Sequence, residues 1–151
     1  MNSDTHSEII KTNIGFFRRF FIICYDLFLL LALLFIITAI FNALNHGKAI
    51  DSSDALYFPL VLTLLSISYL YYAWFWTHGG QTLGLKTWRG RVIDINGGNI
   101  SWKQAAIRYI SSLLSIVVVG LGFIWSFINK EKKTWHDILS KSKIIDLRTK
   151  K

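Results

Sequence analysis

The chain has 151 residues, of which 52% are hydrophobic and 15% aromatic, and its formal net charge at pH 7 is +8. It also contains long uncharged runs, which are rare in a soluble domain of this length, so the composition favours a single integral membrane unit over a soluble globular protein. In a soluble protein such a charge would suggest nucleic-acid binding. Here Lys and Arg flank apolar segments, where they orient helices and attract anionic lipid headgroups. We therefore expect the lipid bilayer as a partner and no nucleic acid.

A polar tail over residues 1–14 precedes the first apolar run, which extends from about residue 19 to residue 44. A helix that spans a bilayer needs roughly 20 predominantly apolar residues, so this run is long enough to cross. It is longer than the ~7–15 residue apolar region of a signal peptide, which favours an uncleaved transmembrane helix. The single Cys24 cannot form an internal disulfide, and we expect it to pack within this helix.

An aspartate, Asp26, lies inside the first apolar run, and Arg19 precedes it on nearly the same helix face. A carboxylate at the bilayer midplane costs about 2.5–3.5 kcal/mol on insertion scales, so Asp26 is expected to have a partner, a water-filled cavity or a shallow position. Two helical turns separate the pair by roughly 10 Å along the axis, which is too far for a direct salt bridge by default. We interpret the pair either as a proton or cation site or as a structural clamp between helices.

The second apolar run covers about residues 56–76 and is rich in aromatic residues at its far end, which is typical of the membrane interface. Thr63 and Ser66 lie on one face of this run and are candidate contacts for an ion. Such residues more often pack or form hydrogen bonds between helices.

The polar segment over residues 77–106 contains a predicted β-hairpin. In its sequence RVIDI–NGGN–ISW, Asn96 and Gly97 supply a tight turn between two short strands. A later β-branched run, KIIDL from Lys143 to Leu147, would add a third strand if both segments lie on the same side of the membrane.

The third apolar run covers about residues 107–128 and raises a conflict of topology. The basic residues around the first two runs place the N-terminus and residues 77–106 in the cytoplasm, yet the tail after the third run is also basic. One full crossing would put that tail outside. We favour a re-entrant or interfacial segment, broken at residues 120–122, which keeps the C-terminus in the cytoplasm. A polar stripe along its first half comprises Arg108, Ser111, Ser112 and Ser115.

Five motifs in order resemble the RDD family of membrane proteins, which is named for one arginine and two aspartates. They are GFFRRFFIICYD (Gly15 to Asp26), GGQTLGLKTWRGRVIDINGG (Gly79 to Gly98), ISWKQAAIRY (Ile100 to Tyr109), GLGFIW (Gly120 to Trp125) and WHDILSKSKII (Trp135 to Ile145). The resemblance covers one domain over residues 15–147, followed by a basic tail at 148–151. It differs from the family pattern at Leu85, where many members have Lys, and at Ser140-Lys141-Ser142, where many have a small-residue stretch.

The resemblance implies that Arg19, Asp26 and Asp137 form the family's charge set. A transport role has been suggested for the family, and some members are associated with sodium/proton antiport. For Asp137 two interpretations remain open. It either caps a helix or pairs with Lys133, Lys141 or Arg108, or it meets Arg19 or Arg18 and so joins the tail to the first helix.

Together these features predict an all-α integral membrane protein with two transmembrane helices, a third apolar helical segment and a short cytoplasmic β-hairpin. We expect a multi-pass protein of the bacterial inner membrane that takes part in transport of ions or small solutes, with cation/proton exchange as the sharpest version. The alternative is a non-transporting adaptor or assembly factor in which the charge set is structural. Arg18 and Arg108 are candidate secondary contacts. Because three helices make a cramped pore, we also expect a homo-oligomer or a partner subunit. No constellation supports catalysis, a metal site or a cofactor.

Overall fold

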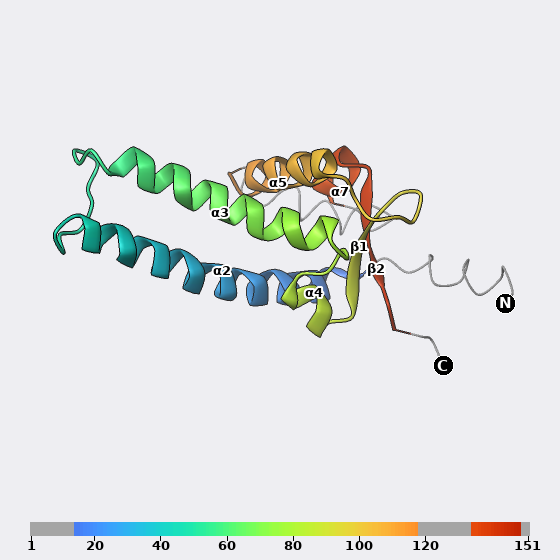
Figure 1. The fold of residues 1–151 in the computed structure, drawn as a ribbon. Helices are drawn as coiled ribbons and strands as arrows, with labels where there is room; N and C mark the ends of the chain where they lie inside the picture. The colour runs from blue at the N-terminus through green and yellow to red at the C-terminus, as the bar shows by residue number, and fades with distance from the viewer. Residues whose placement is uncertain (1–13, 118–133, 149–151) are drawn as a thin grey trace, which may run out of the picture.

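Two long antiparallel helices dominate the computed structural model, which describes residues 14–117 and 134–148 (Figure 1). Helix α2 covers Phe16–Leu44 and helix α3 covers Tyr57–Thr77, with 29 and 21 residues. At 1.5 Å per residue they are roughly 43 Å and 31 Å long. Both are long and apolar enough to cross a membrane by length and composition, as the first two apolar runs predict.

The outer surfaces of these two helices are covered with large apolar side chains. Phe28, Phe35 and Phe58 are 75%, 76% and 78% exposed. Apolar surface of this extent is rare on a soluble monomer and normally contacts lipid or another protein. The surface therefore suits the hydrocarbon of a bilayer.

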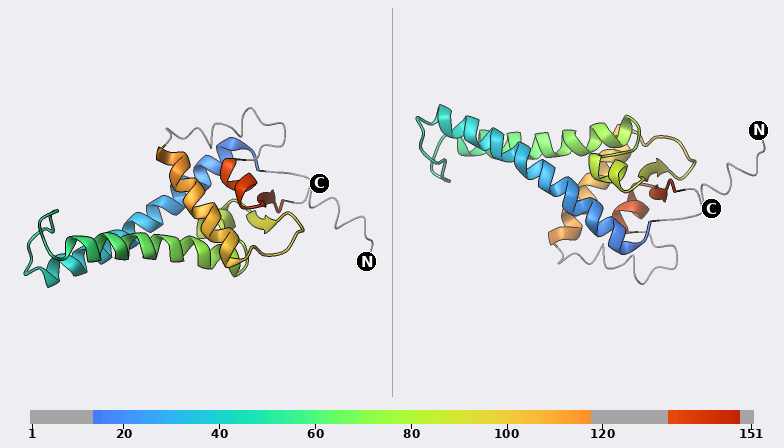
Figure 2. Two further views of the ribbon diagram at one scale, coloured as in Figure 1. Left: turned by 90° about the horizontal axis from the view of Figure 1, so that it is seen from above. Right: turned by 90° about the horizontal axis from the view of Figure 1, so that it is seen from below.

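The shorter elements gather at the end of the pair where α2 begins and α3 ends (Figures 1 and 2). Helix α4 covers Leu83–Thr87 and strand β1 Gly90–Asp94. Helix α5 covers Trp102–Val117 and crosses the long pair. Helix α7 covers Trp135–Leu139, and strand β2 Ser142–Asp146 ends the described chain.

The two strands pair with each other, so the predicted hairpin is wrong. β1 and β2 form an antiparallel sheet in which Val92 lies opposite Ile144. The predicted turn exists, since Gly97 has φ +91° and its N–H donates to the Asp94 carbonyl. The expected return strand does not form, because Ser101 instead accepts the Gln104 N–H at 3.3 Å and so caps the start of α5. The KIIDL run takes its place as the partner strand.

Part of the third apolar run lies outside the described residues, including the break expected at 120–122. The described part forms α5, which begins five residues before the predicted run. Because β1 and β2 are hydrogen-bonded neighbours, residues 90–94 and 142–146 lie side by side. The described segments on either side of the third apolar run therefore meet in one sheet.

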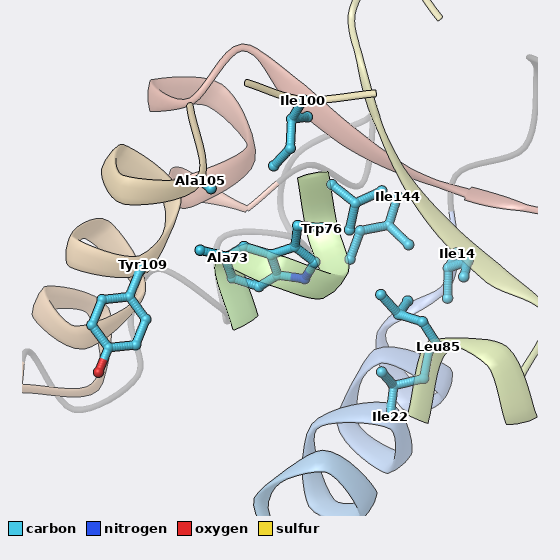
Figure 3. Close-up of a cluster of buried hydrophobic side chains, with 10 residues drawn as sticks. Ile14, Ile22, Ala73, Trp76, Leu85, Ile100, Ala105, Tyr109 and Ile144 are labelled. Atoms are coloured by element: carbon cyan, nitrogen blue, oxygen red, sulfur yellow. The ribbon is translucent and has the colours of Figure 1, made fainter. Parts of the chain in front are cut away.

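A small hydrophobic core joins the long helices to the sheet (Figure 3). Ala73 of α3 and Ala105 of α5 are both fully buried, and their small side chains allow the two helices to pack closely. Ile14 is 1% exposed and its N–H donates to the Ile144 carbonyl, so this end of the predicted polar tail is part of the core. The core fixes the start of α2, the end of α3 and β2 relative to one another. Its members are Ile14, Ile22, Ala73, Trp76, Leu85, Val92, Ile100, Ala105, Tyr109 and Ile144.

Candidate functional site

A buried carboxylate between two guanidinium groups lies at the centre of the capped end. Asp137 accepts a hydrogen bond from Arg19 Nη1 at 2.6 Å and another from Arg108 Nη1 at 2.6 Å. The side chain of Asp137 is 0% exposed, that of Arg19 4% and that of Arg108 2%. They come from α7, the first turn of α2 and α5, so this Arg19–Asp137–Arg108 triad joins three elements that are far apart in the sequence.

The local structure of α7 sets the position of Asp137. Thr134 is the N-cap of this short helix, and Asp137 is its third residue. The Asp137 carboxylate accepts the Thr134 backbone N–H at 3.1 Å, as an acidic residue does in a capping box. Asp137 therefore caps its helix and also binds Arg19 and Arg108. The two interpretations left open by the sequence are compatible.

Electrostatics keep this cluster charged at neutral pH. Burial alone would raise the pKa of Asp137, but the guanidiniums of Arg19 and Arg108 hold it well below its usual value of 3.8. Burial lowers the pKa of the neighbouring His136 to about 3, and the two arginines add to the shift. His136 Nε2 lies 4.0 Å from Asp137. The imidazole is neutral at pH 7, so the triad retains one net positive charge.

Arg108 is held from several sides. Its Nη1 also donates to the Ser142 hydroxyl at 2.7 Å, and its guanidinium lies 5.2 Å from the ring centroid of Trp76. That ring contact is a cation–π interaction within the usual distance. Ser142 in turn shares a hydrogen bond of 2.6 Å with Ser140, whose hydroxyl contacts the His136 carbonyl. The serines that depart from the family pattern thus extend the triad's hydrogen-bond network.

Asp26 does not contact the triad and is bound instead by the segment that begins α4. Its carboxylate accepts the Thr82 hydroxyl through one oxygen and the Gly84 backbone N–H, at 2.8 Å, through the other. Thr82 also caps α4 by accepting the Leu85 N–H at 3.2 Å. A Cβ at position 84 would lie 2.7 Å from the Ile22 carbonyl oxygen, so only glycine permits this close approach of α4 to α2.

A cavity of about 350 Å³ lies between α2, α3 and α5. Arg19, Asp26, Arg108 and His136 belong to its wall, while most other lining side chains are apolar. This volume falls in the range of small-molecule sites, which are mostly apolar with a few placed polar groups. The remaining lining residues are Ile22, Ile23, Leu27, Leu30, Leu34, Leu64, Leu65, Ser68, Tyr72, Trp76, Leu85, Val92, Tyr109, Ser112, Leu113 and Ile144.

The other candidate site residues, Arg18, Thr63 and Ser66, lie outside this cavity wall. Arg18 binds Asp146 and the Trp88 carbonyl. The Thr63 hydroxyl donates to the Pro59 carbonyl of its own helix at 2.7 Å, and Ser66 is exposed.

Three residues of the site were not predicted from the sequence: Thr82, which binds Asp26, and Ser68 and Tyr72, which line the cavity. Thr82 carried a usable signal, since threonine is one of the preferred N-cap residues at the start of a helix. Ser68 bonds the Tyr109 hydroxyl across α3 and α5, and Tyr72 faces the cavity although the aromatic pattern suggested a place at the membrane interface.

The described residues contain no group of three or more His, Cys, Asp or Glu side chains placed to hold a metal ion. The groups that do converge are two guanidiniums, two carboxylates, one neutral imidazole and several hydroxyls. Groups of these kinds can bind charged or polar partners.

Two long apolar helices, with Arg19 and Asp26 buried where the shorter elements pack, suggest a membrane protein. The chain belongs to the RDD family, whose model matches residues 14–141. It is 33% identical over 90 residues to the uncharacterized protein YxaI of Bacillus subtilis (strain 168), a match that covers 59% of each chain. The chain thus spans less than two thirds of this relative. No solved structure matches.

Proposed function

We propose that this protein takes part in the transport of ions or small solutes across the bacterial inner membrane, with the cavity between α2, α3 and α5 as the solute site. One observation carries the proposal: ionisable side chains from three elements belong to the wall of a largely apolar cavity inside the helix pair. Ionisable groups within membrane segments are rare and typically mark substrate or proton pathways. In the sharpest version, cation/proton exchange, Asp26 is the group that exchanges the proton.

The proposed topology has the N-terminus, the sheet and the C-terminus in the cytoplasm. The pairing of β1 with β2 supports it, because strands on opposite sides of a bilayer cannot pair. The basic residues around the sheet agree with the positive-inside rule. Two crossings leave little room for a pathway within one chain, so we propose a homo-oligomer or a partner subunit.

The rival function is that of a non-transporting adaptor, and the triad favours it. Asp137 has a partner on both oxygens and no exposed surface, which is the geometry of a structural clamp. Asp26 is the discriminating residue because it belongs to the cavity wall.

The substitution Asp26→Asn separates the two functions. An asparagine can accept the Gly84 N–H and donate to the Thr82 hydroxyl, so both contacts survive while the charge is lost. Purified protein is reconstituted in liposomes that contain a pH-sensitive dye, and a Na⁺ or K⁺ gradient is imposed. Asp54→Asn, in the loop between α2 and α3, is the matched control.

Transport predicts a cation-dependent pH change that is lost in Asp26→Asn and retained in Asp54→Asn, with equal folding and equal protein in the membrane. No pH change above that of protein-free liposomes contradicts cation/proton exchange. If Asp26→Asn instead fails to fold, the carboxylate is structural and the adaptor function is favoured.

A further inference from the structure

We propose that the cavity between α2, α3 and α5 binds a single-chain amphipathic anion, a carboxylate or phosphate headgroup on one acyl chain. The headgroup binds the guanidiniums of Arg19 and Arg108, and the chain lies along the leucines of α2 and α3. This inference rests on the proposed function in that it names the solute class of the same site. Its test measures binding rather than flux, so its failure can be told apart from a failure of the proposed transport.

The headgroup end is defined by donors that the protein leaves unused. Arg19 Nη2 and Arg108 Nε are both buried and have no hydrogen-bond partner among the described residues. Leaving a charged donor buried and unbonded costs more free energy than leaving a neutral donor so. Both arginines line the cavity, and they share a single carboxylate. An anion placed between them would accept from both free donors and neutralise the remaining positive charge.

The rest of the cavity selects the other half of the ligand. Beyond the arginines its wall is built largely from apolar side chains, among them six leucines of the two long helices and α5. From Arg19 to Leu34 the wall follows α2 for 15 residues, or roughly 22 Å along the axis. An inorganic anion could occupy only the arginine end and would leave the apolar wall without a partner. An acyl chain removes the apolar surface of that wall from water, which is favourable in proportion to the area buried.

The other polar groups of the wall are compatible with an anion at this end. Asp26 lies roughly 10 Å from Arg19 along α2, and hydrogen bonds from the segment that begins α4 occupy both of its oxygens. His136 is next to the triad and neutral at pH 7. Ser68 and Tyr109 bond each other. Asp26 is the only carboxylate among the described residues that line the cavity, and Asp137, which both arginines bind, is not part of its wall.

Headgroup selectivity is measured with the unmodified full-length protein. The protein is placed in nanodiscs of a zwitterionic lipid and titrated with oleate, 1-oleoyl lysophosphatidate or oleyl alcohol, with empty nanodiscs subtracted. We expect saturable binding of one or both anions, at least tenfold tighter than that of the alcohol with the same chain. Tighter oleate binding identifies a free fatty acid as the ligand class, and tighter lysophosphatidate binding identifies a ligand with a phospholipid-type headgroup. Equal binding of the alcohol, or no saturable binding of either anion, overturns the proposal.

Two neighbouring substitutions test the position of the bound acyl chain without changing a residue of the triad. Leu30 is 6% exposed and lines the cavity, whereas Leu31 on the same helix is 55% exposed and points away from it. Leu30→Trp is expected to weaken anion binding at least tenfold, and Leu31→Trp is expected to leave it unchanged. Equal binding to both variants places the ligand outside the cavity and overturns the proposal. If Leu30→Trp fails to fold, the headgroup comparison on the unmodified protein still decides. Binding without flux would refute transport alone, and flux without anion binding would refute this inference alone.

Discussion

The substitution Asp137→Asn is expected to destabilise the protein strongly, because it removes the anion shared by two buried cations. The asparagine keeps the size of the side chain and can still accept the Thr134 N–H, so the helix cap is preserved. What is lost is the charge between Arg19 and Arg108, which then face each other as buried like charges. Removing one partner of a buried ion pair typically costs about 3–5 kcal/mol. The exposures of 4% and 2% for the two arginines place this case among the buried ones.

The effect is measured as the free energy of unfolding of the purified protein in a non-ionic detergent, followed by tryptophan fluorescence. A loss of that size corresponds to a fall in Tm on the order of 10 °C for a chain of this length. Asp146→Asn is the matched control, because Asp146 also binds two arginines, but at 18% and 57% exposure of their side chains. More exposed pairs contribute about 0–1 kcal/mol. A loss for Asp137→Asn below 1 kcal/mol, or equal to that of the control, would refute the triad as a stabilising clamp.

Three further outcomes are expected. Gly84→Ala should lower the free energy of unfolding by about 1–3 kcal/mol, because its Cβ would lie 2.7 Å from the Ile22 carbonyl oxygen. Gly98→Ala places its Cβ in open space and should cost much less. Similar falls in Tm for the two variants would contradict this close packing. The free energy of unfolding should fall as the pH drops from about 6.5 towards 3, by up to about 1.4 kcal/mol per pH unit. The reason is that His136 becomes protonated at a higher pH in the unfolded chain than in the folded one. If a His136→Gln variant shows the same dependence of stability on pH, His136 is not the cause. Cysteines at positions 92 and 144, in a background without the native cysteine, should cross-link on oxidation. These positions lie opposite each other, and the Val92 N–H donates away from β2 to the Gly80 carbonyl. Single-cysteine variants are the controls, and the absence of a cross-link would contradict the pairing.

The long helices could be predicted from composition, whereas the sheet could not be predicted correctly. An apolar run of more than 20 residues has few alternatives to a helix in a membrane. The hairpin failed for a different reason: a tight turn at Asn96-Gly97 specifies a local reversal but not which segment pairs with the strand before it. The choice of β2 depends on Ile144, which reaches the core only after the chain returns from α5. No local pattern encodes a contact separated by some 50 residues.

At the site, too, the sequence predicted positions along one helix but not the contacts between distant segments. Helix periodicity correctly placed Arg19 and Asp26 on one face and correctly gave a separation too large for a salt bridge. It did not give their partners, because those come from α7, α5 and the segment that begins α4. Arg108 was recognised as part of a polar stripe, and the structure shows why the stripe exists: Arg108 and Ser115 are 2% and 1% exposed and face the protein interior.

The two aspartates of the family name therefore have separable physical roles in this chain. Asp137 lies in a closed cluster in which each oxygen has a cationic partner, and its charge is fixed by two guanidiniums at any physiological pH. Asp26 has no cationic partner among its hydrogen-bond donors, which are a hydroxyl and a backbone amide. A change in its protonation or in the ligand beside it would act directly on Thr82 and Gly84, the residues that hold α4 against α2. A ligand in the cavity that changes the charge of Asp26 is therefore expected to weaken the contacts between α4 and α2, while the triad keeps the three elements that it joins in place.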